Sequence, residues 1–132
     1  MTYEELIERH NASQPRRNPR HEESRLQRQC VTWFRVQYPD RVLFAIPNGG
    51  KRNAKEAAIM KGEGVTAGVA DLFLMHAAKG CNGLFIEMKY GDGVQQDTQK
   101  DFQRKATRES YRYVVCNSIE GFMLEVNNYL RK

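Results

Sequence analysis

Long hydrophobic runs are missing from this chain of 132 residues. A membrane-spanning helix needs roughly 20 consecutive apolar residues, and no segment of the sequence approaches that length. The opening MTYEELIERH also lacks the cationic start and the apolar stretch of a secretion signal. We therefore expect a cytoplasmic protein.

Cysteine is scarce and unpaired in the sequence. Cys30, Cys81 and Cys116 are far apart, and none belongs to a CxxC pair. This spacing argues against a disulfide framework and a zinc knuckle, and the three histidines have no ligand spacing either. We expect all three thiols to be reduced and mostly buried.

Acidic residues are outnumbered, with 16 Asp and Glu against 21 Lys and Arg, for a formal net charge of +5. An excess of positive charge favours polyanionic partners. The length and the 40% of hydrophobic residues fit one domain with one core.

The start of the chain differs in composition from the rest. Residues 11–21, NASQPRRNPRH, contain two prolines, three arginines and no apolar side chain larger than alanine. Such a segment cannot join a core. We therefore divide the chain into an N-terminal helix or flexible basic arm, residues 1–21, and a folded domain, residues 22–132.

Apolar spacing predicts alternating helices and strands in the folded domain. The predicted helices cover residues 22–38, 53–61, 97–109 and 119–130, and the predicted strands cover residues 42–46, 70–75, 83–90 and 111–116. The candidate core residues of the last helix are Phe122, Leu124, Val126 and Leu130. AAKGCN, between the second and third strands, has the length and composition of a hairpin link. The order αβαββαβα predicts an α/β fold with a mixed four-stranded sheet flanked by helices.

Two charged residues stand within an apolar predicted strand. In GLFIEMKY, alternation places Glu87 and Lys89 on the same face as Phe85. Charges there are costly unless they are solvated or have a partner such as a metal ion or a phosphate. An exposed strand face with a cross-strand ion pair is the alternative. Asp71 begins the preceding strand, so a hairpin brings Asp71 and Glu87 to one face.

Neighbouring carboxylates repel each other, and a hard cation such as Mg²⁺ or Mn²⁺ neutralises them. Lys89 would then lie beside the ion. From there its amine can orient or deprotonate a water molecule and offset the charge of a phosphate.

Asp71 followed by Glu87-Met88-Lys89 resembles the signature of the PD-(D/E)xK nucleases. The surrounding residues resemble a stand-alone virus-type replication-repair nuclease (VRR-Nuc) domain. The further matching elements are Glu23 with Gln27, the turn Pro47-Asn48-Gly49, Gly64-Val65 and Gly68-Val69 before Asp71, and Gln99 at the start of the next helix. Ala70 stands where the family often has proline, and Glu22 is an alternative to Glu23.

The resemblance implies a restriction-endonuclease-like core. It implies Glu23, Asp71, Glu87 and the main-chain carbonyl of Met88 as metal ligands, Lys89 as the catalytic lysine, and Gln99 as the residue that positions the water or the lysine. The implied activity is hydrolysis of DNA phosphodiesters with Mg²⁺ or Mn²⁺. Resolution of four-way junctions by a homodimer, in phage or bacterial replication and repair, is the expected role. The alternatives are a flap or nicking endonuclease and a non-catalytic basic DNA-binding module.

Basic residues gather after the Pro-Asn-Gly turn. The candidate nucleic-acid-binding residues are Gln27, Asn48, Lys51, Arg52 and Lys55. Contacts of Lys and Arg with phosphates supply sequence-independent affinity, and a helix N-terminus adds a favourable dipole. A solvated helix face is the alternative. A second basic cluster, within residues 100–112, either lies along a duplex or supplies solubility charge.

Overall fold

The computed structural model describes residues 2–13, 19–47 and 53–132. Its helices are α1 (Tyr3–Ser13), α2 (Pro19–Gln37), α3 (Ala54–Gly62), α4 (Asp97–Arg108) and α5 (Ile119–Leu130), and its strands are β1 (Leu43–Ala45), β2 (Leu72–Leu74), β3 (Leu84–Met88) and β4 (Arg112–Cys116). All eight elements predicted for the folded domain are present in the predicted order. Helix α2 starts earlier than predicted, at Pro19, because proline is favoured in the first turn of a helix.

The strands form one mixed sheet in the order β1-β2-β3-β4. Strand β2 pairs antiparallel with both β1 and β3, and β3 pairs parallel with β4. The predicted hairpin between β2 and β3 is confirmed. Since parallel neighbours need a crossover connection, helix α4 joins β3 to β4. The predicted α/β class with a mixed four-stranded sheet is confirmed.

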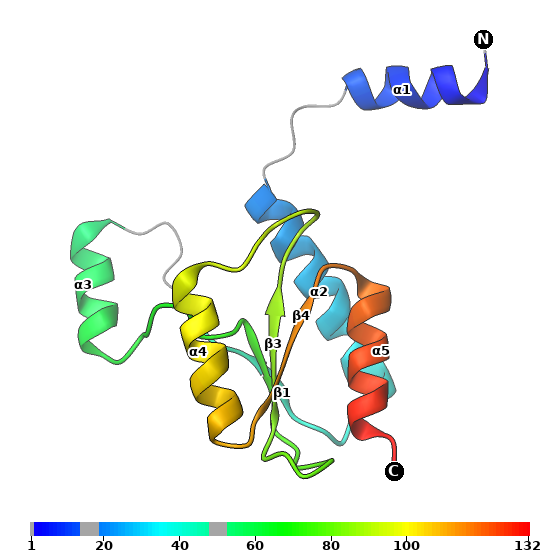
Figure 1. Ribbon diagram of the computed structural model, residues 1–132. Helices are drawn as coiled ribbons and strands as arrows, with labels where there is room; N and C mark the ends of the chain where they lie inside the picture. Colours follow the sequence, from blue (N-terminus) through cyan, green and yellow to red (C-terminus); the bar gives the residue numbers. More distant parts are fainter. Residues whose placement is uncertain (1, 14–18, 48–52) are drawn as a thin grey trace.

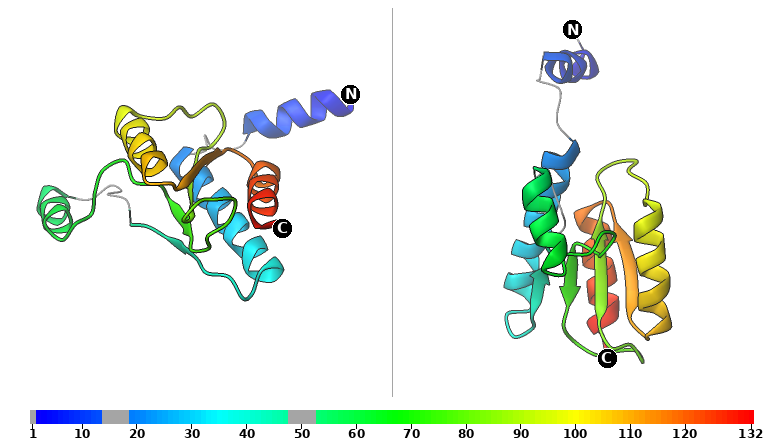
Figure 2. Two further views of the ribbon diagram at one scale, coloured as in Figure 1. Left: turned by 60° about the horizontal axis from the view of Figure 1, so that its bottom comes forward. Right: turned by 90° about the vertical axis from the view of Figure 1, so that its left-hand side faces the viewer.

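Helices α2 and α5 cover one face of the sheet and enclose the main core (Figures 1 and 2). Every second residue of β3 from Leu84 is fully buried there. In α5, Phe122 and Val126 are buried as predicted, but Leu124 is 59% exposed, so its predicted burial is wrong. Two residues along a helix turn a side chain to the opposite side, and Tyr129, seven residues after Phe122, is the third buried residue of α5.

Aromatic side chains cover the opposite face of the sheet. Phe44, Phe73, Phe85 and Tyr113 are register partners across the four strands. Phe102 of α4 packs over this row, with its ring centroid 5.0 Å from that of Phe85. Glu87 is two residues beyond Phe85 on β3, so it shares the face of the aromatic row.

Helices α1 and α3 stand away from the sheet and its covering helices (Figures 1 and 2). None of the nine residues of α3 is buried. No helix in residues 2–13, 19–47 or 53–132 is long and apolar enough to cross a membrane. The three cysteines are free, with Cys30 and Cys116 buried and Cys81 half-buried, as the sequence predicted.

Candidate active site

Asp71 lies just before β2, at the end of the sheet where β3 finishes. Its Oδ2 accepts a hydrogen bond of 2.6 Å from the Met88 N–H. Its main-chain carbonyl accepts one of 2.8 Å from the Ile46 N–H, after β1. Asp71 is therefore tied to the ends of both neighbouring strands.

The glycine-bearing segment before Asp71 packs closely against the start of α4. Gly68 has a φ of +86°, a backbone conformation that L side chains rarely adopt. A Cβ at this position would lie 2.3 Å from the main-chain oxygen of Thr98. Glycine thus permits both the turn and the close approach that deliver Asp71 to the site.

Glu87 is fully buried, and its two carboxylate oxygens have different surroundings. Oε1 accepts hydrogen bonds from the Tyr113 hydroxyl and from Gln95 Nε2, the latter at 2.9 Å. Oε2 accepts none from any residue that the structure describes. Burial, followed by the hydrogen bond to Glu87, raises the pKa of Tyr113, so its hydroxyl stays a proton donor.

Lys89 supplies the positive charge beside this unbonded oxygen. Its Nζ lies 3.7 Å from Glu87 Oε2, and its side chain is 12% exposed. The Lys89 main-chain N–H donates to the Cys116 carbonyl at 2.9 Å, which holds the chain beyond β3 against β4. The main chain of Lys89 is therefore fixed at the end of the sheet, and its ammonium group lies beside Glu87.

Glu23 approaches the same site from α2. Its pKa is raised, chiefly by burial and then by the negative charge of Asp71, while Lys89 and a hydrogen bond from the Tyr90 N–H lower it. Glu22, the alternative residue, is buried, forms an ion pair with Arg25 at 3.6 Å and lines a cleft of about 280 Å³. The electrostatic surroundings favour Glu23 as the helix-borne carboxylate.

The donor set fits a hard divalent cation, although the carboxylates do not form a closed cage. Within the described part of the chain, no three His, Cys, Asp or Glu side chains form a metal-binding group. The unbonded, fully buried Oε2 of Glu87 is nonetheless the kind of oxygen that such a cation takes as a ligand. Because Mg²⁺ keeps several waters and is often held by one or two carboxylates with substrate phosphates, an open site of this kind suits it.

Comparison with known proteins finds an informative similarity, to a solved structure. No protein-family model and no curated protein matches the chain. A solved structure described as a VRR_NUC domain protein superposes with a TM-score of 0.69 and 25% sequence identity, over 83% of this chain and 88% of that chain. The chain folds as a VRR-Nuc domain. This VRR-Nuc similarity indicates a nuclease-type function.

The glutamines of the candidate site are arranged differently from the prediction. Gln99 Oε1 accepts a hydrogen bond of 2.8 Å from the Gln96 N–H and thereby caps α4. Gln95, four residues earlier, is the glutamine that contacts Glu87. The role of Gln99 beside the water or Lys89 stays a prediction, and its observed contact is a helix cap.

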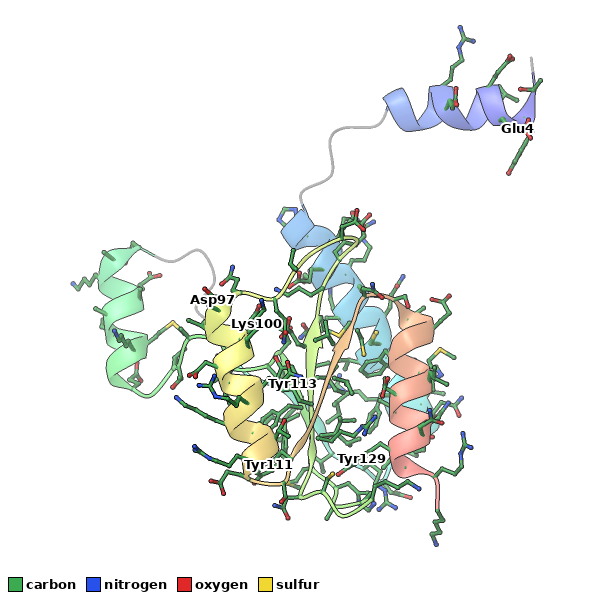
Figure 3. The ribbon with its side chains drawn as sticks, in the orientation of Figure 1. Glu4, Asp97, Lys100, Tyr111, Tyr113 and Tyr129 are labelled. Carbon is green, nitrogen blue, oxygen red and sulfur yellow. The ribbon has the colours of Figure 1, made fainter. Side chains whose placement is uncertain are left out.

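Sequence reasoning missed Gln95 and Tyr113 as residues of the site. For Tyr113 a signal exists, since alternation along the fourth strand together with its register places it opposite Phe85, on the face of Glu87. Figure 3 labels Tyr113 on β4 and Tyr111 just before that strand, and the Tyr113 ring packs against Phe102 of α4. Nothing in the sequence distinguishes Gln95 from its neighbour Gln96.

The candidate DNA-binding residues are only partly described. Gln27 is half-buried on α2, one turn after Glu23, and Lys55 is exposed in the first turn of α3. Asn48, Lys51 and Arg52 lie outside the described residues.

The second basic cluster is largely paired with acidic residues. Arg104 and Lys105 both pair with Asp101, Arg108 pairs with Glu109, and Arg112 pairs with Glu125. These pairs offset much of its positive charge, which favours the solubility interpretation over contact with a duplex.

Proposed function

We propose that this VRR-Nuc domain is a metal-dependent, structure-specific DNA endonuclease. The observation that carries the proposal is the buried Oε2 of Glu87, which lies 3.7 Å from Lys89 Nζ and accepts no hydrogen bond within the described chain. Asp71 accepts a hydrogen bond from the N–H of Met88, the residue after Glu87, and the charges of Asp71, Lys89 and Glu87 all act on Glu23. We also propose that residues 22–132 form the nuclease domain and residues 1–21 an N-terminal helix or flexible basic arm, although α2 already begins at Pro19.

The metal-binding residues in this proposal are Glu23, Asp71, Glu87 and the Met88 carbonyl. A bound Mg²⁺ or Mn²⁺ supplies Lewis-acid polarisation of a phosphoryl oxygen and neutralises charge. Lys89, held beside Glu87, hydrogen-bonds the attacking water or a phosphate oxygen. The water oxygen forms a bond to phosphorus while the bond to the 3′ oxygen breaks. The water proton passes to solvent and the 3′ oxygen takes up another, giving a 5′-phosphate and a 3′-hydroxyl.

Branched DNA with two-fold character, such as a four-way junction, is the proposed substrate, in phage or bacterial replication and repair. The net charge of +5 suits a polyanion. Two coordinated cuts in a symmetric junction need two sites, and each chain supplies one, so we propose a homodimer.

The test is cleavage of labelled four-way junction, 5′ flap and linear duplex DNA, each with Mg²⁺, Mn²⁺ or EDTA. Wild type, Glu87→Gln and the control Glu109→Gln are compared, since Glu109 is an exposed residue just after α4. We expect metal-dependent, paired symmetric cuts in the junction by wild type and the control. Glu87→Gln should cut roughly 100-fold more slowly or worse, because the carboxylate that would hold the charge-stabilising metal ion is replaced by a neutral amide.

The other outcomes separate the alternatives. Equal or faster cleavage of flaps or linear DNA would replace the junction-resolving role with that of a flap or nicking endonuclease. Binding of DNA without any cleavage in Mg²⁺ or Mn²⁺ would leave a non-catalytic DNA-binding module.

A further inference from the structure

The two carboxylate oxygens of Glu87 have unequal surroundings, because neighbouring side chains donate hydrogen bonds to only one of them. Oε1 accepts from both Tyr113 and Gln95, whereas Oε2, 3.7 Å from Lys89 Nζ, accepts from no described residue. A carboxylate buried only for packing is expected to have both oxygens satisfied, because an unmet buried acceptor costs about 1–3 kcal/mol. The asymmetry therefore points to a ligand for Oε2.

The two donors to Oε1 are themselves held in place. Tyr113 is buried on the strand next to Glu87, and its ring centroid is 6.0 Å from that of Phe102 on α4. Gln95 Nε2 also donates to Gln103 Oε1 on α4 at 2.8 Å. Strand β4, the segment after β3 and helix α4 thus fix one oxygen of Glu87 together.

Fixing one oxygen decides which oxygen remains available. The terminal torsion of a glutamate side chain is broad and roughly two-fold, so a free carboxylate exchanges its oxygens by rotation. Two donors on Oε1 oppose that rotation and keep Oε2 on the side of Lys89. Hydrogen bonds of this kind to a metal-binding side chain orient it before the ion arrives.

We propose that Tyr113 and Gln95 are positioning residues that hold one oxygen of Glu87 and so present the other to the metal ion. The proposal rests on the metal-dependent function proposed above. Tyr113 and Gln95 act through Glu87, and neither is assigned contact with the DNA or with the ion.

The test measures Mn²⁺ binding without DNA, by the electron paramagnetic resonance signal of free Mn²⁺. Wild type, Tyr113→Phe, Gln95→Leu and the control Tyr111→Phe are titrated. Tyr111 is two residues from Tyr113 on the same sheet face, and its ring packs against Phe73 and Phe85. We expect Tyr113→Phe and Gln95→Leu each to weaken Mn²⁺ affinity, roughly 10- to 100-fold for the pair together, and Tyr111→Phe to retain wild-type affinity.

Cleavage at varied Mn²⁺ concentration supplies the second measurement. The Mn²⁺ concentration for half-maximal rate should rise in both variants, with a smaller change in the rate at saturating Mn²⁺. A purely structural role would lower the melting temperature and leave the Mn²⁺ affinity unchanged.

The outcomes distinguish this inference from the function on which it rests. Wild type that neither binds Mn²⁺ nor cuts DNA would overturn the proposed function. Wild type that does both, with unchanged Mn²⁺ affinity in Tyr113→Phe, would overturn the positioning role alone. If Tyr113→Phe does not fold, Gln95→Leu decides in the same way, because Gln95 lies outside the regular elements.

Discussion

Gly68→Ala tests the close approach that delivers Asp71 to the site. A Cβ there would meet the Thr98 main-chain oxygen at 2.3 Å and its carbonyl carbon at 2.5 Å. Ordinary contact begins at 3.4 Å, so the backbone must separate by about 1 Å. Such overpacking costs roughly 1–3 kcal/mol, and a side chain at positive φ adds about 1–2 kcal/mol.

The expected loss for Gly68→Ala is therefore roughly 2–5 kcal/mol. For a domain of this size that lowers the melting temperature by about 8–20 °C. Gly64→Ala is the matched control, since Gly64 has a φ of +103° but a Cβ there would meet no described atom within 4 Å. It should lose about 1–2 kcal/mol, the strain alone.

The two alanine variants are compared by thermal melting and by DNA cleavage at a temperature at which both remain folded. A displacement of about 1 Å near Asp71 should slow cleavage by Gly68→Ala on the order of 100-fold, while Gly64→Ala keeps most of its rate. Equal melting temperatures for the two variants would refute the reasoning, because they would show that residues 65–70 do not press against α4.

Two further predictions concern titratable groups. The raised pKa of Glu23 means that folded, metal-free protein binds the Glu23 proton more tightly than the unfolded chain does, so ionised Glu23 opposes folding above that pKa. Glu23→Gln should therefore raise the melting temperature at pH 7. This gain should vanish as the pH falls below 4.5, the ordinary pKa of glutamate. A gain that does not change with pH would contradict the prediction. Burial raises the pKa of Cys30 and Cys116 to about 12, and both thiols are buried. Iodoacetamide at pH 8 should therefore alkylate Cys81 first, which peptide mapping over time would show. Equal alkylation rates at the three thiols would contradict the burial of Cys30 and Cys116.

Much of the fold was predictable because apolar spacing records which side of each element is buried. The alternation in β3 and the hairpin to β2 correctly placed Asp71 and Glu87 at one end of one sheet. Leu124 shows where this reasoning failed, because an apolar residue on an exposed helix face cannot be told from a core residue by its type.

The contacts made by polar side chains were harder to predict. Gln95 and Gln99 are four residues apart in sequence, yet Gln99 caps α4 and Gln95 contacts Glu87. The path of the chain between β3 and α4 decides which glutamine caps the helix and which one contacts Glu87. Sequence spacing carries no information about that path. The choice between Glu22 and Glu23 likewise needed the rotation of α2 about its axis.

The candidate site draws its groups from α2, from the start of β2 and from the end of β3, segments that are far apart along the chain. Contacts of long sequence separation form slowly, since loop closure must precede them. The candidate site would therefore be complete only after α2 and the strands of the sheet have packed together. If the proposed function holds, a nascent or partly unfolded chain would have the charge that attracts DNA but no assembled centre to cut it, so cleavage would be confined to the finished fold.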